Sequence, residues 1–241
     1  DVLRANILTL MNMLEWCTKG NCGCFLYSSS SETYAGTVNC YLDSHAEYIP
    51  TREDIPLTID NVLNPRWSYG GSKLIGEIIT ANYGRVNDLP VKIIRYHNIY
   101  GPRMGFDHVL PEFIKRIYDG ENPFTIYGGE ETRAFCDVRD GVRATEAVML
   151  SDSCQGEIVH IGKSDEEVKI IDLLRKLLGI AGKSPRLAVK AAPEGCVSRR
   201  CPCTDKLYRL TGYRANISLD EGLPEIYQWY MKKYKEMEEE K

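Results

Sequence analysis

Two short apolar runs with a helical segment between them constrain the fold of this chain more than any other feature. The run "CFLYSSSS", residues 24–31, begins apolar and ends in serines, as expected of a buried parallel strand that leads into a loop. The run "VKIIRY", residues 91–96, is rich in β-branched and aromatic residues and follows a Leu89-Pro90 turn signal. Strand, helix and strand in this order indicate a right-handed crossover. We therefore expect an α/β fold with a partial doubly wound parallel sheet.

The helix between the two strands is predicted from the signals at its ends. Asn64 can cap it, Pro65 suits its first turn, and the Asn-Tyr-Gly sequence of residues 82–84 favours its end. Residues 1–18 carry apolar side chains at helical spacing, which predicts another helix before the first strand. The buried stripe of the helix over 65–84 is expected to consist of Leu74, Ile75, Ile78 and Ile79.

The remaining segments predict one long loop and a second, smaller region. Residues 35–64 contain glycine and prolines without periodicity, and long loops of this kind in compact domains are usually functional. We therefore divide the chain into residues 1–104, which hold the sheet, and residues 105–241, a smaller α/β region with some segments that return to the sheet. In this second region we expect helices over 108–119, 140–150, 167–179, 204–210 and 219–233 and strands near 124–127, 135–138, 157–161 and 186–190.

The composition of the chain argues against some classes of binding partner. A formal net charge of −4 and a pI near 5.7 argue against a nucleic-acid-binding surface, which gathers Lys and Arg. No run approaches the roughly 18 to 20 apolar residues of a membrane span, and a cytoplasmic location is expected. The nine cysteines are an odd number, so they are expected to be reduced thiols. A zinc site at Cys196, Cys201 and Cys203 is the alternative, but the C-x-C spacing does not favour it, and no metal is expected.

Tyr69 and Lys73 carry the strongest chemical signal. Residues four apart on a helix lie one above the other, so the two functional groups can approach. A phenol titrates near 10 in free solution, and a neighbouring ammonium favours the phenolate, so Lys73 could prepare Tyr69 to accept a proton from a substrate hydroxyl. Serines 28–31 follow the first strand, at the sheet edge where ligands bind, and one of them could contact the same oxygen. Removal of a hydride from that carbon would require a nicotinamide. The alternative is a solvated helix face, where a Tyr and a Lys four apart also occur by chance.

Five segments in the right order resemble one family over essentially the whole chain. This family is the extended short-chain dehydrogenases/reductases, with NAD-dependent nucleotide-sugar epimerases, dehydratases and decarboxylases among its members. The resemblance implies a partial Rossmann-like NAD-binding domain with the catalytic residues at 1–104 and a nucleotide-sugar-binding region at 105–241. The segments are "FLYSSSSETYAG", "WSYGGSK", "RYHNIYGPR", "ETRAFCDVRDGVRA" and "SRRCPCTDKLYRLTGY" with "SLDEGL", in which Cys203 stands where an aspartate is usual.

The resemblance also implies roles for single residues. Tyr69 is similar to the catalytic base, Lys73 to the residue that holds the nicotinamide ribose, and Ser30 to the catalytic serine or threonine. Tyr96 would flank the nicotinamide, and Ser28 would also belong to the cofactor site. Ser31 and Asn98 would contact the substrate, and Arg133 and Arg200 would bind the nucleotide phosphates, a task suited to guanidinium groups. Asn98 could instead only start a turn and Arg200 could be a surface charge, while His97 is expected to pack near the site.

Glu32 bears on the type of reaction. In the family, dehydratases and decarboxylases carry a glutamate at this place, where it could move a proton beside a 4-keto group. The aspartate usual in 4,6-dehydratases is Ser31 here, which argues against dehydration. The expected activity is an NAD-dependent nucleotide-sugar 4-epimerase. The alternatives are a UDP-glucuronate-type decarboxylase or 4,6-dehydratase, and a non-catalytic sugar-nucleotide-binding module.

Two further expectations follow from the resemblance. The glycine-rich strand and turn that receive the cofactor pyrophosphate in this family do not precede Asp1, so the chain is expected to lack that part, and whether this form binds NAD and is active stays open. Members of the family pair through the helix that carries the Tyr and Lys and the helix before it. A homodimer through residues 1–18 and 65–84 is therefore expected.

Overall fold

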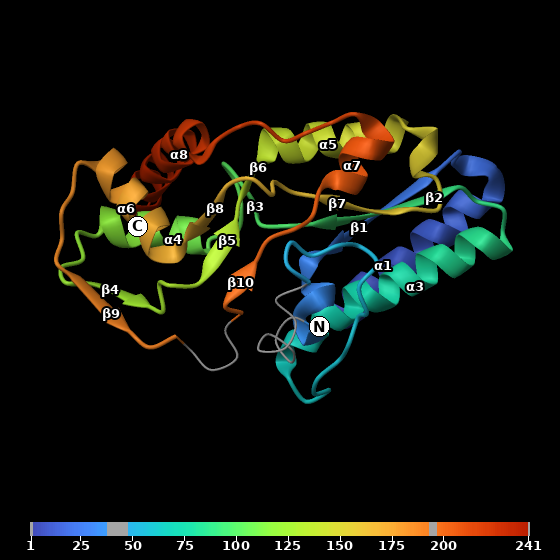
Figure 1. Ribbon diagram of the computed structural model, residues 1–241, viewed down its shortest axis with the longest axis horizontal. Helices are drawn as coiled ribbons and strands as arrows, with labels where there is room; N and C mark the ends of the chain where they lie inside the picture. Colours follow the sequence, from blue (N-terminus) through green and yellow to red (C-terminus); the bar gives the residue numbers. More distant parts are fainter. Residues whose placement is uncertain (1, 38–47, 193–196, 241) are drawn as a thin grey trace.

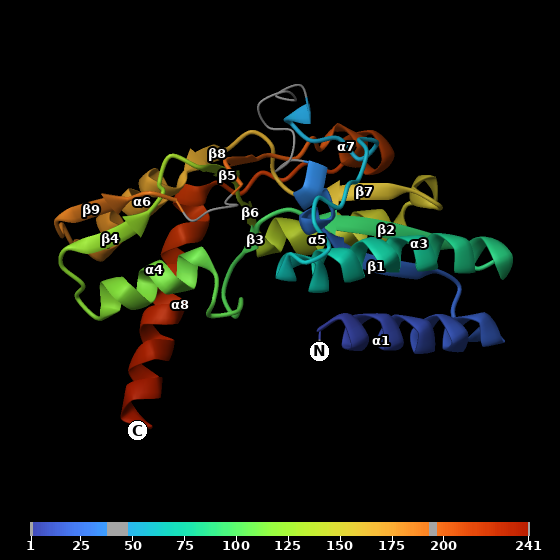
Figure 2. The same ribbon diagram turned by 90° about the horizontal axis from the view of Figure 1, so that it is seen from below.

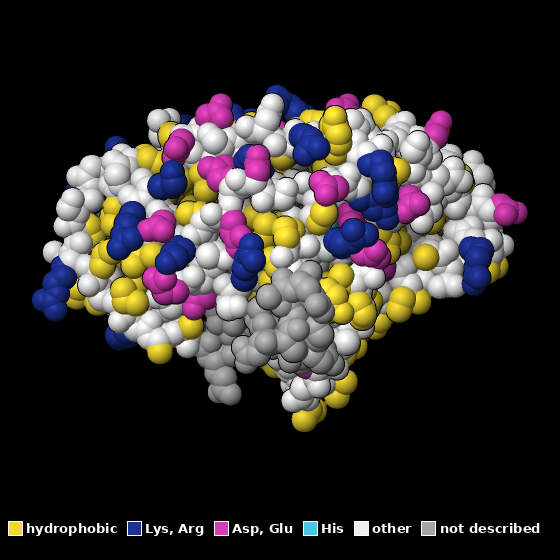
Figure 3. All heavy atoms as spheres, viewed as in Figure 1, with side chains coloured by type: hydrophobic (Ala, Val, Ile, Leu, Met, Phe, Trp, Pro, Cys, Tyr) yellow, Lys and Arg dark blue, Asp and Glu magenta, His cyan; other side chains and the backbone are white. Residues whose placement is uncertain are grey.

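The computed structural model describes residues 2–37, 48–192 and 197–240. Figure 1 shows two lobes, one with the N terminus and a layered arrangement of helices and strands, the other with the C-terminal helix. The charged side chains of both signs are mixed over the face seen in Figure 3. None of the helices within these ranges is long and apolar enough to cross a membrane.

The first lobe is built on a parallel sheet of β1 (Phe25–Ser30), β2 (Val91–Tyr96) and β7 (Ile158–Ile161), in the order β1-β2-β7. Ser30 pairs with Tyr96 in the register, so both strands end at the same edge of the sheet. The helix α3 (Gly70–Val86) connects β1 to β2. The strand, helix and strand expected from the sequence are confirmed, and with them the α/β fold class.

Helices cover both faces of this sheet because the strands are apolar on both sides. Ile93 packs with the side of α1 (Val2–Trp16) that carries Leu10 and Leu14, while its neighbour Ile94 packs with Val148 on the opposite face. Adjacent residues of a strand point to opposite faces, which produces two separate cores from one strand. Figure 1 shows α1 and α3 on one face of the sheet, with α5 (Val138–Leu150) and α7 (Asp205–Thr211) on the other.

The second lobe has its own apolar core, which α4, α6 and α8 enclose. Fully buried leucines of α6 and Phe124 of β4 meet Ile226 and Tyr230 of α8 there. The strand β10 pairs with β5, and β5 pairs with β8, so a small sheet lies between the lobes (Figure 1). The bounds are α4 (Val109–Tyr118), α6 (Ile170–Ala181), α8 (Leu219–Glu239), β3 (Ile99–Tyr100), β4 (Phe124–Tyr127), β5 (Thr132–Ala134), β6 (Cys136–Asp137), β8 (Glu167–Lys169), β9 (Leu187–Lys190) and β10 (Arg199–Arg200).

Short helical turns modify the expected elements. Asn64 caps the segment as expected, since its side chain accepts from the Arg66 amide, but the first turn is the 3-10 helix η4 (Pro65–Ser68). The 3-10 helix η2 (Ser31–Tyr34) follows β1 directly, and residues 35–37 are helical, so the expected loop begins later than residue 35. Residues 38–47 of that expected loop and Cys196 of the alternative zinc site lie outside the described residues. The remaining turns are η1 (Cys17–Asn21) and η5 (Asp152–Cys154).

The expected buried stripe of α3 is correct only in part. Ile79 packs against the apolar core and Leu74 is half-buried. Ile75 and Ile78, however, are 43% and 56% exposed, whereas Gly76 and Glu77 are buried. A Cβ at Gly76 would lie 2.0 Å from the hydroxyl oxygen of Tyr27, so only glycine allows α3 to approach β1 this closely. The helix therefore leaves a stripe with Ile75 and Ile78 outward.

This outward stripe supports the predicted homodimer. Large apolar side chains of α1 and α3 are exposed on neighbouring helices (Figure 2), a kind of surface that often marks a protein interface. We predict that Ile78→Glu shifts the protein from dimer to monomer, because it places a charge in the apolar contact. Light scattering after size-exclusion chromatography measures this change. The exposed apolar residues of the two helices are Val2, Leu3, Leu8, Met13, Trp16, Ile75, Ile78 and Val86.

Val189→Glu is the matched control for the dimer prediction. Val189 is 57% exposed, close to the 56% of Ile78, but it lies on β9 in the other lobe. This variant should leave the molecular mass in solution unchanged. A dimer that survives Ile78→Glu, or that Val189→Glu also dissociates, would contradict an interface through α1 and α3.

Candidate active site

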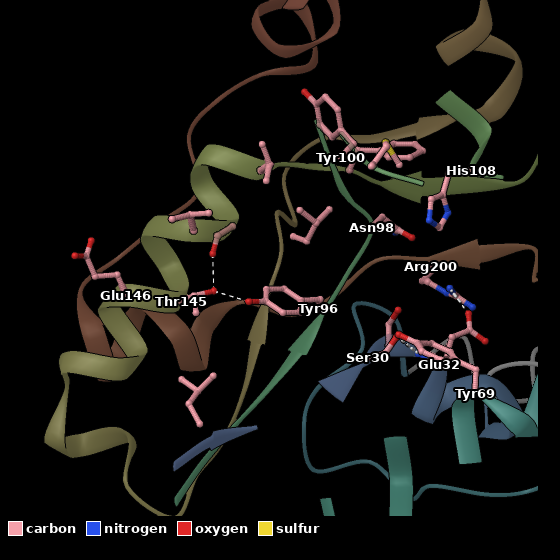
Figure 4. A pocket seen from close by; sticks show the side chains of 18 of the residues that line it. Ser30, Glu32, Tyr69, Tyr96, Asn98, Tyr100, His108, Thr145, Glu146 and Arg200 are labelled. Carbon is pink, nitrogen blue, oxygen red and sulfur yellow. Dashed lines mark hydrogen bonds and ion pairs between the residues drawn. The ribbon is translucent and has the colours of Figure 1, made fainter. Parts of the chain in front are cut away.

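The ends of β1 and β2 open into a cavity of about 1180 Å3. Its wall combines these strand ends with η2, the start of α3, α5 and β10, and Figure 4 shows their side chains around a common space. Open α/β sheets bind ligands at this position, outside the carboxyl ends of parallel strands. Seven of the residues expected from the sequence line the cavity: Ser30, Ser31, Glu32, Tyr69, Tyr96, Asn98 and Arg200.

Tyr69 and Lys73 lie together as their spacing predicts. Tyr69 directly precedes α3, is 41% exposed and faces the cavity near Ser30 (Figure 4). The Nζ atom of Lys73 lies 5.7 Å from the centroid of the Tyr69 ring and donates a hydrogen bond of 2.9 Å to the carbonyl oxygen of Ser28. Burial lowers the pKa of Lys73. The carbonyl of Ser28 thus fixes an ammonium beside an accessible phenol, while the Ser28 side chain does not line the cavity.

Glu32 lies between two guanidinium groups. Its Oε1 atom is 2.8 Å from NH1 of Arg200, and its Oε2 atom is 3.6 Å from Nε of Arg66. The hydroxyl oxygen of Ser30 accepts from the Glu32 amide at 3.2 Å, which holds the first turn of η2. Arg200, expected to bind phosphates, is therefore paired with Glu32 in this structure. Arg66 was not among the expected site residues, although it lies three positions before Tyr69 in "NPRWSY".

Tyr96 and Asn98 enter the cavity from the end of β2. The Tyr96 hydroxyl lies 2.9 Å from Oγ1 of Thr145, so its ring is directed toward α5 (Figure 4). Asn98 has a φ of 43°, in the left-handed region that asparagine tolerates better than most residues. Its side-chain nitrogen donates to the carbonyl oxygen of Ala134 at 3.0 Å, which fixes the amide in the cavity wall. Thr145 and Glu146 of α5 also line the cavity, but they belong to none of the sequence motifs and were not predicted.

Arg133 does not reach the cavity wall. Its NH2 atom donates to the carbonyl oxygen of Val197 at 2.6 Å, and NH1 donates to that of Thr132 at 2.7 Å. The parallel pairing of β5 with β10 brings these carbonyls to the guanidinium. The structure therefore separates Arg133 from the other residues of the expected site, and a phosphate-binding role for it remains a prediction.

A buried polar network joins β1, β2, β7, η2 and α3. Arg95 is 2% exposed and donates to both carboxylate oxygens of Glu77, at 2.8 and 2.6 Å, while the Ser29 hydroxyl donates to the same carboxylate at 2.5 Å. Arg95 also donates to the Tyr34 hydroxyl, which lies 2.7 Å from Nε2 of His160. Because Nδ1 of His160 is 3.1 Å from the Cys203 carbonyl, Nδ1 carries the proton and Nε2 accepts from Tyr34.

This network predicts a loss of stability in mild acid. Burial, aided by the nearby Arg95, lowers the pKa of His160 to about 3, and burial lowers the pKa of His97 well below its usual value. Both rings stay neutral in the fold, whereas the unfolded chain binds protons below a pH of about 6.5. The free energy of unfolding should therefore fall as pH decreases below that value, by up to about 1.4 kcal/mol per pH unit for each ring. Urea unfolding at several pH values measures the slope.

The window for this measurement is set by Glu53. Burial raises the pKa of Glu53, which favours the fold at acid pH and opposes the histidine effect there. The opposing effect extends upward from the usual pKa of a glutamate, near 4.3, to the raised pKa in the fold, so the slope that begins as pH falls through about 6.5 reports on the two rings best. His160→Gln should remove about half of the slope. A stability that stays constant over this fall in pH would contradict two neutral buried histidines.

Comparison with known proteins assigns the chain to a protein family. A model of the NAD dependent epimerase/dehydratase family matches residues 1–162. The chain belongs to this family. A UDP-N-acetyl-alpha-D-glucosaminuronate decarboxylase from Bacillus cytotoxicus is 30% identical over 240 residues, which cover 95% of this chain and 70% of that protein.

Solved structures of similar proteins share the fold of this family member. A UDP-glucuronic acid 4-epimerase from Bacillus cereus, crystallised with NAD, superposes with a TM-score of 0.78 at 26% identity over 95% of this chain and 67% of that one. A UDP-glucose 4-epimerase from Thermotoga maritima, crystallised with UDP-glucose, gives a TM-score of 0.80 at 26% identity over 96% of this chain and 71% of that one. The Rossmann-like fold expected from the sequence is thereby confirmed.

The family is NAD-dependent, and the cavity suits the nicotinamide ribose end of this cofactor. Lys73 uses one N–H on the Ser28 carbonyl, so two further donors are available for ribose hydroxyls. The Tyr69 ring lies with its centroid 5.7 Å from the Nζ atom of Lys73, and Tyr96 supplies a second ring on the cavity wall (Figure 4). Polar donors for a ribose and an aromatic ring for a flat nicotinamide are thus both present.

Proposed function

We propose that this chain carries the catalytic and sugar-binding residues of an NAD-dependent nucleotide-sugar 4-epimerase. The observation that supports it is that Tyr69 and Ser30 line the cavity together, while the Nζ atom of Lys73 lies 5.7 Å from the centroid of the Tyr69 ring. An accessible phenol beside a fixed ammonium is suited to remove a proton from a substrate hydroxyl. A hydroxyl group at a strand end is suited to bind the same oxygen.

In the proposed mechanism Tyr69 accepts the proton of the sugar C4 hydroxyl. Lys73 stabilises the phenolate form by its positive charge, and Ser30 donates a hydrogen bond to the C4 oxygen as it becomes a ketone. Bound NAD supplies the acceptor, and later the donor, of the hydride at C4. The 4-keto sugar turns in the cavity, and Tyr69 returns the proton when the opposite face is reduced.

A UDP-sugar is the proposed substrate class. The two solved relatives are both described as epimerases of UDP-sugars, and the decarboxylase relative is also named for one. Arg200 provides a partly buried guanidinium at the cavity wall, and Asn98 provides a fixed amide. A diphosphate would compete with Glu32 for Arg200, because guanidinium groups bind phosphates in the same paired geometry as carboxylates.

Product analysis tests this function. The protein is incubated with NAD and either UDP-glucose or UDP-glucuronate, and the sugar nucleotides are separated by chromatography. Conversion to the 4-epimer is expected. If calorimetry detects binding of a UDP-sugar but no binding of NAD, the chain is a binding module and the proposed enzyme activity is wrong.

Decarboxylation of a UDP-hexuronate is the second candidate, because Glu32 lies in the cavity with Arg200 at 2.8 Å. A carboxylate and a guanidinium next to a 4-keto sugar could move a proton after loss of carbon dioxide. Release of carbon dioxide with a UDP-pentose from UDP-glucuronate would favour this candidate over epimerisation. The relative from Bacillus cytotoxicus is named as a decarboxylase, which supports the same test.

A further inference from the structure

A second, much smaller cavity lies behind the wall of the active site. Its volume is about 10 Å3, close to the smallest space that holds one water molecule. Ser31 and Arg200 line this cavity and the large one, so these two residues form the partition between them. The residues around the small cavity are Ser31, Tyr34, Ala35, Thr51, His97 and Arg200.

His97 is the unusual member of this group. Its side chain is 1% exposed, and within the described residues neither Nδ1 nor Nε2 has a hydrogen-bond partner. The ring packs against that of His160, with a centroid distance of 4.3 Å, and is therefore held in place. A neutral imidazole has one donor and one acceptor, and to bury both without partners is costly. Buried polar groups in native proteins nearly always find protein or water partners.

We propose that one ordered water molecule occupies the small cavity, binds His97, and holds Ser31 and Arg200 in position at the active site. A buried water needs two to four polar partners. His97 supplies a donor or an acceptor, and Ser31 and Thr51, which also line the cavity, each carry a hydroxyl group. Arg200 has five N–H donors, and the ion pair with Glu32 occupies only some of them. His97 is thus a positioning residue that acts through the water and does not touch the substrate.

The water matters for function because Arg200 has to change partners. In the structure its guanidinium binds Glu32, and under the proposed function a diphosphate would take that place. A fixed contact on the far side of Arg200 would keep its guanidinium in the partition during this exchange. The role in ligand binding rests on the proposed function, whereas the water site does not.

A crystal structure of the protein tests the water directly. One density peak is expected in the small cavity, within about 3.2 Å of a ring nitrogen of His97. An empty cavity would overturn the proposal. This result is independent of activity, so it stands even if no UDP-sugar is converted.

Two variants test the positioning role. His97→Asn keeps a donor and an acceptor, while His97→Phe keeps an aromatic ring of similar shape and removes both. Calorimetry with uridine diphosphate should show binding at least about tenfold weaker for His97→Phe, and within about threefold of the original for His97→Asn, since an unpaired buried group costs about a tenfold change or more. Thermal unfolding verifies that each variant is folded.

The outcomes separate the two proposals. Equal affinity of the original protein and both variants for uridine diphosphate would overturn the positioning role. Absence of any binding by the original protein would count against the proposed function, and the crystallographic peak would then decide the water site alone. If His97→Phe does not fold, the crystallographic peak still decides the water site. Binding of uridine diphosphate by a folded His97→Asn that is more than about threefold weaker than the original would then contradict the positioning role.

Discussion

Tyr69→Phe should lower the turnover of a UDP-sugar by about 100-fold or more, because general base catalysis by a positioned side chain contributes about that factor. The change removes one oxygen and leaves the ring, which is 41% exposed, in the cavity wall. The affinity for uridine diphosphate should therefore stay the same. Initial rates by chromatography, with calorimetry for the nucleotide, measure both quantities.

Tyr127→Phe is a matched control for this result. Tyr127 is exposed on β4, and Nζ of Lys190 lies 5.5 Å from its ring centroid, much as Lys73 lies 5.7 Å from that of Tyr69. It does not line the active-site cavity. The control should keep full turnover. Normal turnover in Tyr69→Phe would contradict the central role of this phenol.

Arg95→Met should lower the free energy of unfolding by about 3–5 kcal/mol, since it leaves the buried carboxylate of Glu77 without its cation. Among the residues that the structure describes, Glu77 would then keep only the hydrogen bond from Ser29. The side chains of the pair are 2% and 5% exposed, so water cannot replace the lost contact. Urea unfolding gives the free energy.

Two comparisons make this stability prediction specific. Arg95→Met combined with Glu77→Leu should recover much of the loss, because an apolar pair of similar volume needs no compensation. Arg52→Met breaks the pair with Asp54, whose side chains are 68% and 67% exposed, and should cost less than about 1 kcal/mol. Equal costs for Arg52→Met and Arg95→Met would contradict the importance of burial.

The sequence predicts those parts of the site that depend on local geometry. Tyr69 and Lys73 are one helical turn apart, and Ser30 and Tyr96 each end a parallel strand, so helix spacing and sheet topology alone bring them together. The strands β1, β2, β4, β7 and β9 follow from their apolar runs for the same reason. Short-range rules of this kind need no knowledge of distant contacts.

Contacts between distant segments were not predicted. Arg66, Glu32 and Arg200 meet only because three separate elements converge at the cavity, and no spacing in the sequence relates them. The contacts of Arg133 were not predicted either, since the carbonyls of Val197 and Thr132 accept its hydrogen bonds. The orientation of α3 was predicted only in part, because Ile79 packs against the core as expected, whereas Ile75 and Ile78 are exposed and the ion-paired Glu77 is buried.

Tyr69, directly before α3, and Lys73 and Glu77 within it follow one another at intervals of four, and Arg95 of β2 binds the last of them. The rotational orientation of α3 is therefore fixed to the sheet about two turns away from Tyr69. One residue inserted between Lys73 and Glu77 would rotate the two ends of the helix against each other by about 100°. Residues can be added to this helix beyond Glu77, but a single residue added ahead of that anchor would turn the Tyr69 side chain away from the cavity.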